Sequence, residues 1–296
     1  MKIAFIGCVK FSAALLEALL DHPDAELVGL VTCRESSINA DFYNLRPLVQ
    51  QVDCPVFEFR FTDDNQTAMT TWLRKCQPEI IYCFGWSRLL PPEILAIPPL
   101  GVVGYHPAAL PQNRGRHPII WALALGLKHT ASTFFFMDEA ADSGDILDQM
   151  PVTIEANDNA GNLYHKLINI AQPQLKTLTT RLATGNIQRT PQDHSNANYW
   201  RKRSVADGCI DWRMSAQNIH NLIRALAPPY PGAHHEQGEQ EIKIWRARPV
   251  ATSNTNWEPG KVLSVNHQHI TIKCGEGAIE LLEHDFQTLP REGRYL

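Results

Sequence analysis

Several patterns that identify common classes of protein are missing from this sequence of 296 residues. The first apolar segment, 2–7, continues as Cys8-Val9-Lys10 and not as G-x-G-x-x-G, so a dinucleotide pyrophosphate finds no glycine cradle and a nicotinamide enzyme is disfavoured. No G-x-S-x-G motif occurs, and a covalent serine nucleophile is therefore not indicated. No apolar run reaches the roughly 18 residues that a transmembrane helix needs, so we expect no contact with a membrane.

Cysteine pairing and excess charge are also scarce. The seven cysteines are scattered, and none forms a C-x-x-C pair, so neither a disulfide framework nor a zinc site is expected and no metal is assigned. The net charge of −4 argues against a broad nucleic-acid footprint. No signal-peptide pattern precedes the first expected strand, which favours a cytoplasmic protein.

The patterns that are present predict an α/β protein with an open, mostly parallel twisted sheet. Short apolar runs typical of buried strands occur at 2–7, 27–32, 55–59, 79–84, 100–105 and 130–137. Helices are expected near 11–19, 65–77, 91–96, 118–126 and 158–182. Pro173 is expected to kink or divide the last of these helices, and the polar residues 186–198 to form a linker or flap.

The C-terminal part has a different pattern. A helix is expected at 215–226, followed by alternating strands at 242–247, 261–265, 270–274 and 278–283. This pattern predicts a small β-rich module. We expect a catalytic domain over residues 1–203 and a small C-terminal domain over residues 204–296.

Polar residues gather where several expected strands end. The segment 84–88, His106 and the segment 138–145 each lie at the carboxyl end of an expected strand. If these strands are neighbours, the three line one crevice. Taken singly, His106 fits a structural histidine and Asp142 a turn or capping aspartate. Together they suggest an acid/base pair, because a histidine accepts a proton near pH 7 and a carboxylate stabilises its charged form.

Three further groups are candidates for binding. Arg114 and Arg116 precede a helix that begins at Pro118, which suits an anion site or solvated loop arginines. The run 199–203, Tyr-Trp-Arg-Lys-Arg, suits either stacking on a base beside a phosphate or a plain inter-domain linker. The run 84–86, Phe-Gly-Trp, offers a flat wall to an aromatic ligand, although its phenylalanine fits a core position equally well.

Two linked motifs carry a family resemblance. They are His106-Pro107-x-x-Leu110-Pro111-x-x-Arg114-Gly115-x-x-Pro118-x-x-Trp121-Ala122 and Met137-Asp138-x-x-x-Asp142-x-Gly144-Asp145-Ile146. With Pro229-Tyr230-Pro231-Gly232-Ala233 and Pro259-Gly260-Lys261-Val262, the chain resembles the N10-formyltetrahydrofolate-dependent formyltransferases. That family includes enzymes acting on methionyl-tRNA, on phosphoribosylglycinamide and on nucleotide sugars. The resemblance implies a Rossmann-like formyltransferase domain followed by a small β-rich module.

The resemblance also implies roles for individual residues. His106 and Asp142 match the catalytic histidine and aspartate, which relay a proton while an amine attacks the formyl carbon of 10-formyltetrahydrofolate. The implied residues at the formyl-donor site are Phe84, Gly85, Trp86, Leu89, Asp138 and Asp142. The expected residues at the acceptor site are Tyr105, Pro107, Arg114, Gly115, Arg116, Tyr199, Trp200, Lys202 and Arg203.

The sequence around His106 is similar to that of the branch of the family that acts on nucleotide-linked amino sugars. The expected acceptor is a UDP-linked 4-amino-4,6-dideoxy sugar. This implies a role in O-antigen or other surface-polysaccharide biosynthesis, with a homodimer as the candidate assembly. Methionyl-tRNA is the alternative acceptor, against which the hardly basic segment 34–46 argues. The family carries an asparagine where this chain has Gly104, so a catalytically impaired folate- or nucleotide-sugar-binding protein is an alternative from another class. Asn113 is the candidate to replace that asparagine.

Overall fold

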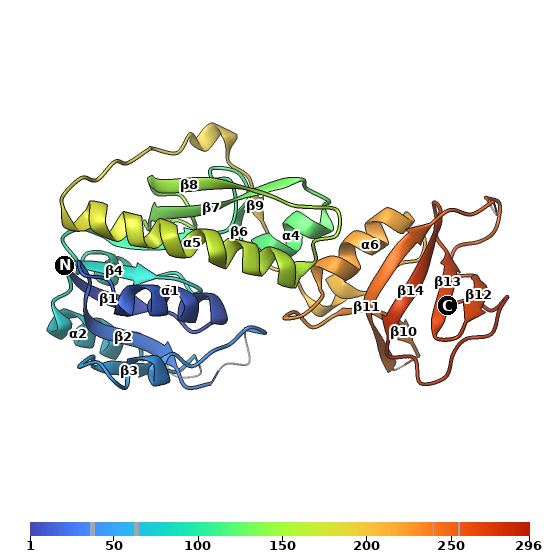
Figure 1. The fold of residues 1–296 in the computed structure, drawn as a ribbon, viewed down its shortest axis with the longest axis horizontal. Coiled ribbons are helices and arrows are strands. Elements are labelled where there is room, and N and C mark those ends of the chain that lie inside the picture. The colour runs from blue at the N-terminus through green and yellow to red at the C-terminus, as the bar shows by residue number, and fades with distance from the viewer. Residues whose placement is uncertain (36–38, 62–64, 239, 254) are drawn as a thin grey trace. The chain divides into compact units, whose positions relative to one another are not determined.

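The computed structural model describes all residues except 36–38, 62–64, 239 and 254 (Figure 1). Part of the hardly basic segment 34–46 therefore lies outside the described residues. The chain forms two compact units. The first comprises 1–118, 130–152 and 165–200, and the second comprises 119–129, 153–164 and 201–296.

The first unit contains a seven-stranded sheet in the order β3-β2-β1-β4-β5-β7-β8. Its strands are β1 (Lys2–Ile6), β2 (Glu26–Cys33), β3 (Val56–Phe59), β4 (Ile80–Cys83), β5 (Val102–His106), β7 (His129–Phe136) and β8 (Ile146–Thr153). The first five strands are parallel, and β7 is antiparallel to β5. The expectation of an open, mostly parallel α/β sheet is confirmed.

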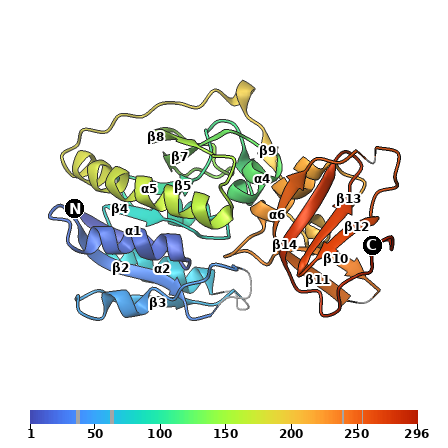
Figure 2. The same ribbon diagram turned by 45° about the vertical axis from the view of Figure 1, so that its right-hand side comes forward.

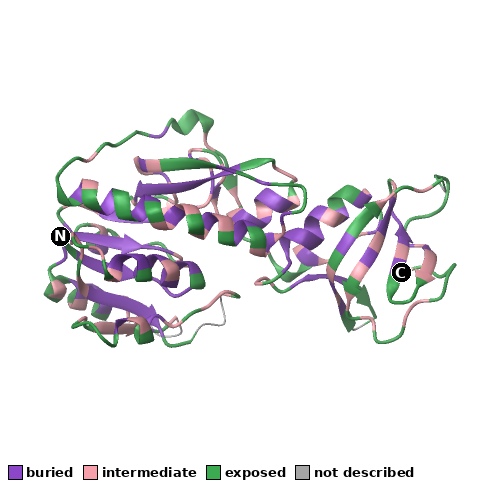
Figure 3. Cartoon of the chain, in the orientation of Figure 1, coloured by how far each residue is buried: buried purple, intermediate pink, exposed green. Residues whose placement is uncertain are grey.

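Helices cover this sheet, which is why its central strands are almost entirely buried (Figure 3). The helical segments of the unit are α1 (Lys10–Leu20), η1 (Arg46–Val49), α2 (Gln66–Cys76), α3 (Pro92–Leu95), most of α5 (Ala160–Ala183) and η2 (His194–Asn196). The helix α5 continues through Pro173, so this proline does not divide it. Thr179 of α5 lies 3.0 Å from the hydroxyl of the buried Tyr82, a contact that fixes the helix on the sheet.

The second unit is built around an antiparallel five-stranded sheet in the order β10-β11-β14-β13-β12 (Figure 2). Its strands are β10 (Ala233–Gln237), β11 (Gln240–Val250), β12 (Val262–Asn266), β13 (His269–Lys273) and β14 (Ala278–His284). Its helical segments are most of α4 (Pro118–Ala124), η3 (Val205–Gly208) and α6 (Ala216–Ala225). The β-rich module is thus confirmed, and the polar strand β10 was missed because its sequence, AHHEQ, lacks apolar alternation.

Two very short strands complete the first unit. β6 (Arg114–Gly115) pairs in parallel with β9 (Tyr199–Trp200), which brings the polar segment before β9 against the loop that follows β5. None of the helices in the described part of the chain is both long and apolar enough to cross a membrane.

Candidate active site

His106 is the last residue of β5, and both nitrogens of its ring face protein groups. Nε2 lies 2.7 Å from the carbonyl oxygen of Asn113, and Nδ1 lies 3.6 Å from Oδ2 of Asp142. A carbonyl oxygen can only accept, so Nε2 must carry a hydrogen and donate it. In the neutral ring, Nδ1 is then a lone pair facing a carboxylate. The arrangement therefore places a proton acceptor, Nδ1, beside the carboxylate of Asp142.

Asp142 reaches His106 by a route that the sequence analysis did not foresee. Because β7 runs antiparallel to β5, with Phe136 opposite Val103, the loop after β7 begins at the far end of β5 from His106. The assumption that three carboxyl strand ends share one edge is therefore wrong for β7. The loop returns along the sheet and presents Asp142 with a left-handed backbone, φ 56°. Its Oδ2 also accepts a hydrogen bond of 2.8 Å from the backbone N–H of Gly115.

Arg114 is buried, with 1% of its surface exposed, and every nitrogen of its guanidinium has a partner. It donates to Oε1 of Gln192 at 3.2 and 2.7 Å and to the hydroxyl of Tyr199 at 2.8 Å, and it lies 3.2 Å from Nδ1 of His194. These contacts place Arg114 in the framework of the site.

Gln192 links that framework to the loop 138–145, which carries Asp142. Its Nε2 donates to the carbonyl oxygens of Asp142 at 3.0 Å and Gly144 at 2.6 Å. Gly144 is required there, because a Cβ would lie 1.9 Å from the carbonyl oxygen of Phe136. The sequence analysis missed Gln192, which lies in the segment 186–198 that was expected to be a linker or flap.

Arg116 has more freedom than Arg114. Its Nη1 donates to the carbonyl oxygen of Ser87 at 2.7 Å, and no other hydrogen bond of this guanidinium involves a described residue. The contact joins the loop carrying Gly115 to the segment 84–89, so that segment belongs to the same site.

The segment 84–89 presents its residues unequally. Phe84 is fully buried and packs against Phe5, Tyr82 and Phe134. Gly85 has φ 65°, and a Cβ there would lie 2.2 Å from Val9. Trp86 is half-buried against Phe59 and Phe61, whereas Leu89 is 60% exposed. Among the apolar side chains of this segment, Trp86 and Leu89 are the ones accessible to a ligand.

The remaining candidates occupy different surroundings. Tyr105 stacks on Phe11 with ring centroids 4.3 Å apart, on the opposite face of β5 from His106, and burial raises the pKa of its hydroxyl. Oδ1 of Asp138 accepts hydrogen bonds from Ser143 and Ala140, which shape the loop 138–145.

The acceptor candidates outside β5 and the arginine loop divide between the two units. Pro107 accepts a hydrogen bond from Thr130 on its carbonyl, and the carbonyl of Trp200 accepts one from Arg116, both within the first unit. Lys202 and Arg203 belong to the second unit. Arg203 lies over the ring of Trp121 at 4.6 Å, and burial lowers the pKa of its guanidinium.

Gly104 lies two residues before His106 in β5. A Cβ at this position would lie 2.9 Å from Cγ of Met137 and 2.9 Å from the ring of Phe135. The space that the family's asparagine would need is therefore filled by these two side chains. Asn113 lies near, since its carbonyl contacts His106, and its side-chain amide makes no hydrogen bond with the described residues.

Several solved structures share this fold at low sequence identity. An N-formyltransferase from Helicobacter canadensis, in complex with folinic acid and dTDP-3-aminofucose, is 16% identical over 96% of this chain and 99% of that chain, with a TM-score of 0.71. A methionyl-tRNA formyltransferase from Clostridium thermocellum is 17% identical over 96% of this chain and 99% of that chain, with a TM-score of 0.60. A variant of HypX from Aquifex aeolicus is 16% identical over 96% of this chain, with a TM-score of 0.66. This chain covers only 45% of the HypX chain.

Family membership rests on two sequence matches that together span most of the chain. The family described as "Formyl transferase" matches residues 1–179, which include every residue around His106 and Asp142 discussed above except the segment 190–200. "Formyl transferase, C-terminal domain" matches residues 202–290, which include the five-stranded sheet. The chain belongs to the formyl transferase family.

Proposed function

We propose that this protein transfers a formyl group from 10-formyltetrahydrofolate to the amine of a nucleotide-linked amino sugar. The observation that carries the proposal is the pair of His106 and Asp142, 3.6 Å apart, beside a loop with Arg116, whose guanidinium makes one hydrogen bond among the described residues. The fold is similar to that of the Helicobacter canadensis enzyme, which was solved with folinic acid and dTDP-3-aminofucose. This similarity supports both the proposed donor and the proposed class of acceptor.

The residues present fit a folate donor. A pterin is a flat ring with a polar edge, and the half-buried Trp86 with the exposed Leu89 offers it an apolar wall. The backbone of the loop 138–145 supplies polar groups within the same site. The donor contributes a carbonyl carbon that an amine can attack.

The pair takes up the proton that the reaction releases. As the acceptor nitrogen bonds to the formyl carbon, it loses a proton, and the bond from that carbon to the donor nitrogen breaks. The Asp142 side chain is 20% exposed and that of His106 only 5% exposed, so the proton enters at Asp142 and is shared with Nδ1. The proton then passes to the donor nitrogen as it leaves.

The oxygen of the formyl group gains negative charge in the transition state and needs a hydrogen-bond donor. Gly104 cannot supply one. The side-chain amide of Asn113 has no partner among the described residues and lies on the residue whose carbonyl contacts His106. We assign Asn113 to this role.

Arg116 is the residue that we assign to the acceptor's diphosphate. A guanidinium with free N–H groups binds phosphate oxygens in a bidentate manner. Arg114 is not available for it, since its donors are used within the protein. A UDP-linked 4-amino-4,6-dideoxy sugar is our specific candidate acceptor.

The test is an assay of purified protein with 10-formyltetrahydrofolate and a panel of UDP- and dTDP-linked 3-amino and 4-amino sugars, read by mass spectrometry. We expect formylation of at least one sugar and none of methionyl-tRNA. Efficient formylation of the tRNA, with affinity that falls steeply with salt, would support the alternative acceptor. Folate binding without any transfer would support the impaired binding protein.

The pair itself is tested by His106→Ala, Asp142→Asn and the double variant. Each single variant should lower kcat by about 100-fold or more, and the double variant should lose far less than the product of the two, because the groups act as a unit. Circular dichroism must show an intact fold. Multiplicative losses, or near-normal turnover in either single variant, would remove the pair from the mechanism.

A further inference from the structure

In the second unit, His234 is buried with a ring nitrogen that has no hydrogen-bond partner. The residue is 1% exposed, and its Nε2 makes no hydrogen bond in the described structure. An unsatisfied polar atom in the interior is costly, so it calls for a partner of some kind. The nearest charged group is Oε1 of Glu236, which lies 3.8 Å away.

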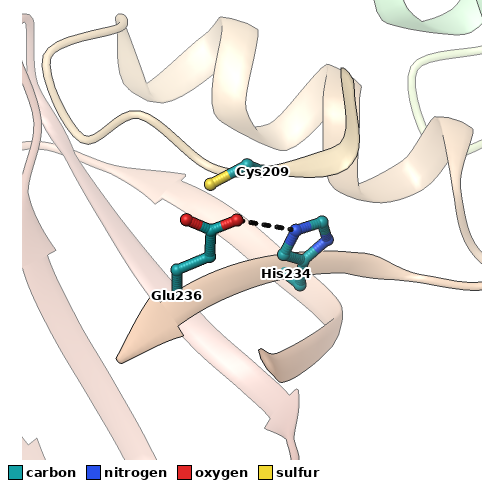
Figure 4. Close-up of side chains that lie close together, drawn as sticks. All are labelled: Cys209, His234 and Glu236. Atoms are coloured by element: carbon teal, nitrogen blue, oxygen red, sulfur yellow. Dashed lines mark ion pairs between the residues drawn. The ribbon is translucent and has the colours of Figure 1, made fainter. Parts of the chain in front are cut away.

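A thiol completes a cluster around this nitrogen. Cys209 follows η3 and forms an isolated β-bridge with His234, while Glu236 lies two residues further along β10 and so points to the same side as His234. Sγ of Cys209, a ring nitrogen of His234 and a carboxylate oxygen of Glu236 all lie within 4.8 Å of one another. Figure 4 shows the three side chains converging from β10 and from the segment after η3.

We propose that Cys209, His234 and Glu236 bind a divalent cation of the zinc class. Thiolate, imidazole and carboxylate are the three donors that zinc accepts. Tetrahedral coordination places such donor atoms about 3.3–3.6 Å apart. The separation of 3.8 Å between His234 and Glu236 is close to that value, and the Glu236 side chain, 62% exposed, can move to adjust. Three protein donors leave the fourth position to water.

The charges nearby favour a cation at this point. Asp211 is paired with Arg213 at 2.6 Å, and Glu241 with Lys243 at 2.8 Å. Glu236 has no Lys or Arg partner among the described residues; its ion-pair partner is His234. A bound cation supplies the missing positive charge and converts the thiol to a thiolate.

The site would act on the structure of the second unit. It joins β10 to the segment after η3. The two are already linked by the bridge, by the hydrogen bond of 2.7 Å from Ile210 N–H to the carbonyl of His234, and by the contact of Trp212 with His235. Metal binding to folded protein raises its stability with metal concentration. The proposal is independent of formyl transfer, because its measurements are metal content and thermal stability.

The experiment uses the full chain after dialysis against a chelator. Zn²⁺ is added, excess is removed, and bound metal is counted by mass spectrometry; Co²⁺ is added in parallel to look for a thiolate-to-cobalt charge-transfer band. We expect one equivalent per chain and a rise in Tm on adding Zn²⁺. Cys209→Ser should abolish the cobalt band, and Glu236→Gln should weaken affinity at least about tenfold.

Matched controls separate this cluster from the other thiols and acids. Cys54→Ser removes a thiol that is also partly exposed, and Glu241→Gln removes the carboxylate paired in register with Glu236. Both variants should bind metal as the unaltered protein does. His234 is so deeply buried that its replacement risks misfolding, which is why the exposed Glu236 carries the test. Absence of stoichiometric metal, or binding unchanged in Cys209→Ser, would reduce the cluster to an ion pair and overturn the proposal.

Discussion

Gly104→Asn is the substitution that most directly tests why this chain departs from its family. The change installs the family's asparagine two residues before His106, on the same face of β5. If the position were merely vacant, the new amide would add a donor for the formyl oxygen, which is typically worth about 3–4 kcal/mol in the transition state. The structure argues for the opposite outcome.

The reason is the lack of space around position 104. A Cβ would lie 2.9 Å from Met137 and 2.9 Å from Phe135, before the amide itself is placed. Overpacking of this kind costs about 1–3 kcal/mol. In a unit of this size, that cost lowers Tm by about 2–4 °C for each kcal/mol. Displaced side chains would also shift β7 and the loop after it, so turnover should fall by about tenfold or more.

The assay is kcat and folate affinity measured beside Tm, with Gly104→Ala and the double variant Gly104→Asn/Met137→Ala as comparisons. Gly104→Ala should lower Tm as well, but by less than Gly104→Asn does. The double variant should recover Tm relative to Gly104→Asn, because removing the Met137 side chain makes room. A single variant with higher kcat and unchanged Tm would refute the packing argument.

Three other outcomes are expected. Asn113→Gly keeps a residue suited to the observed φ of 64° but removes the amide, so kcat should fall by about 100-fold with little change in Tm; unchanged kcat would exclude the assigned role. Arg116→Gln should raise KM for the nucleotide-linked acceptor by about tenfold or more without loss of Tm, whereas Arg114→Gln should lower stability by about 2–5 kcal/mol; the reverse pattern would contradict the assignment. Burial lowers the pKa of His220 and of His235, so the unfolded chain binds protons that the folded second unit does not. Its Tm should fall as pH drops below about 6.5, and less so in His220→Gln.

Much of the fold was predictable because its signals are local. Each central strand is a short apolar run, and the helix after Pro118 begins with the residue that tolerates the first helical position. The proximity of His106 and Asp142 was expected from local patterns as well, although the path of the loop that brings Asp142 to His106 was not. Strands with little apolar alternation, such as β10, gave no such signal.

The parts that failed depend on contacts between distant residues. The two arginines of the loop look alike in sequence. Contacts with Gln192, His194 and Tyr199, 78 to 85 residues further on, distinguish the buried Arg114 from the more accessible Arg116. Likewise, β7 runs antiparallel to β5, and no local feature of its apolar sequence predicts that it would not be parallel. Local patterns identify which residues carry polar chemistry, and long-range hydrogen bonds decide which of them face a ligand.

The position of Asp142 shows what those long-range contacts accomplish. The loop from β7 has to return along β5, and it does so with a left-handed residue at Asp142 and with a glycine at 144 that lets the backbone approach Phe136 closely. Such a conformation is not held by the loop alone. Gln192 fixes it by bonding to two of its carbonyl oxygens, and Arg114 in turn fixes Gln192. In the mechanism proposed above, the buried arginine would therefore act through geometry, because it holds in place, through Gln192, the loop that carries the Asp142 carboxylate.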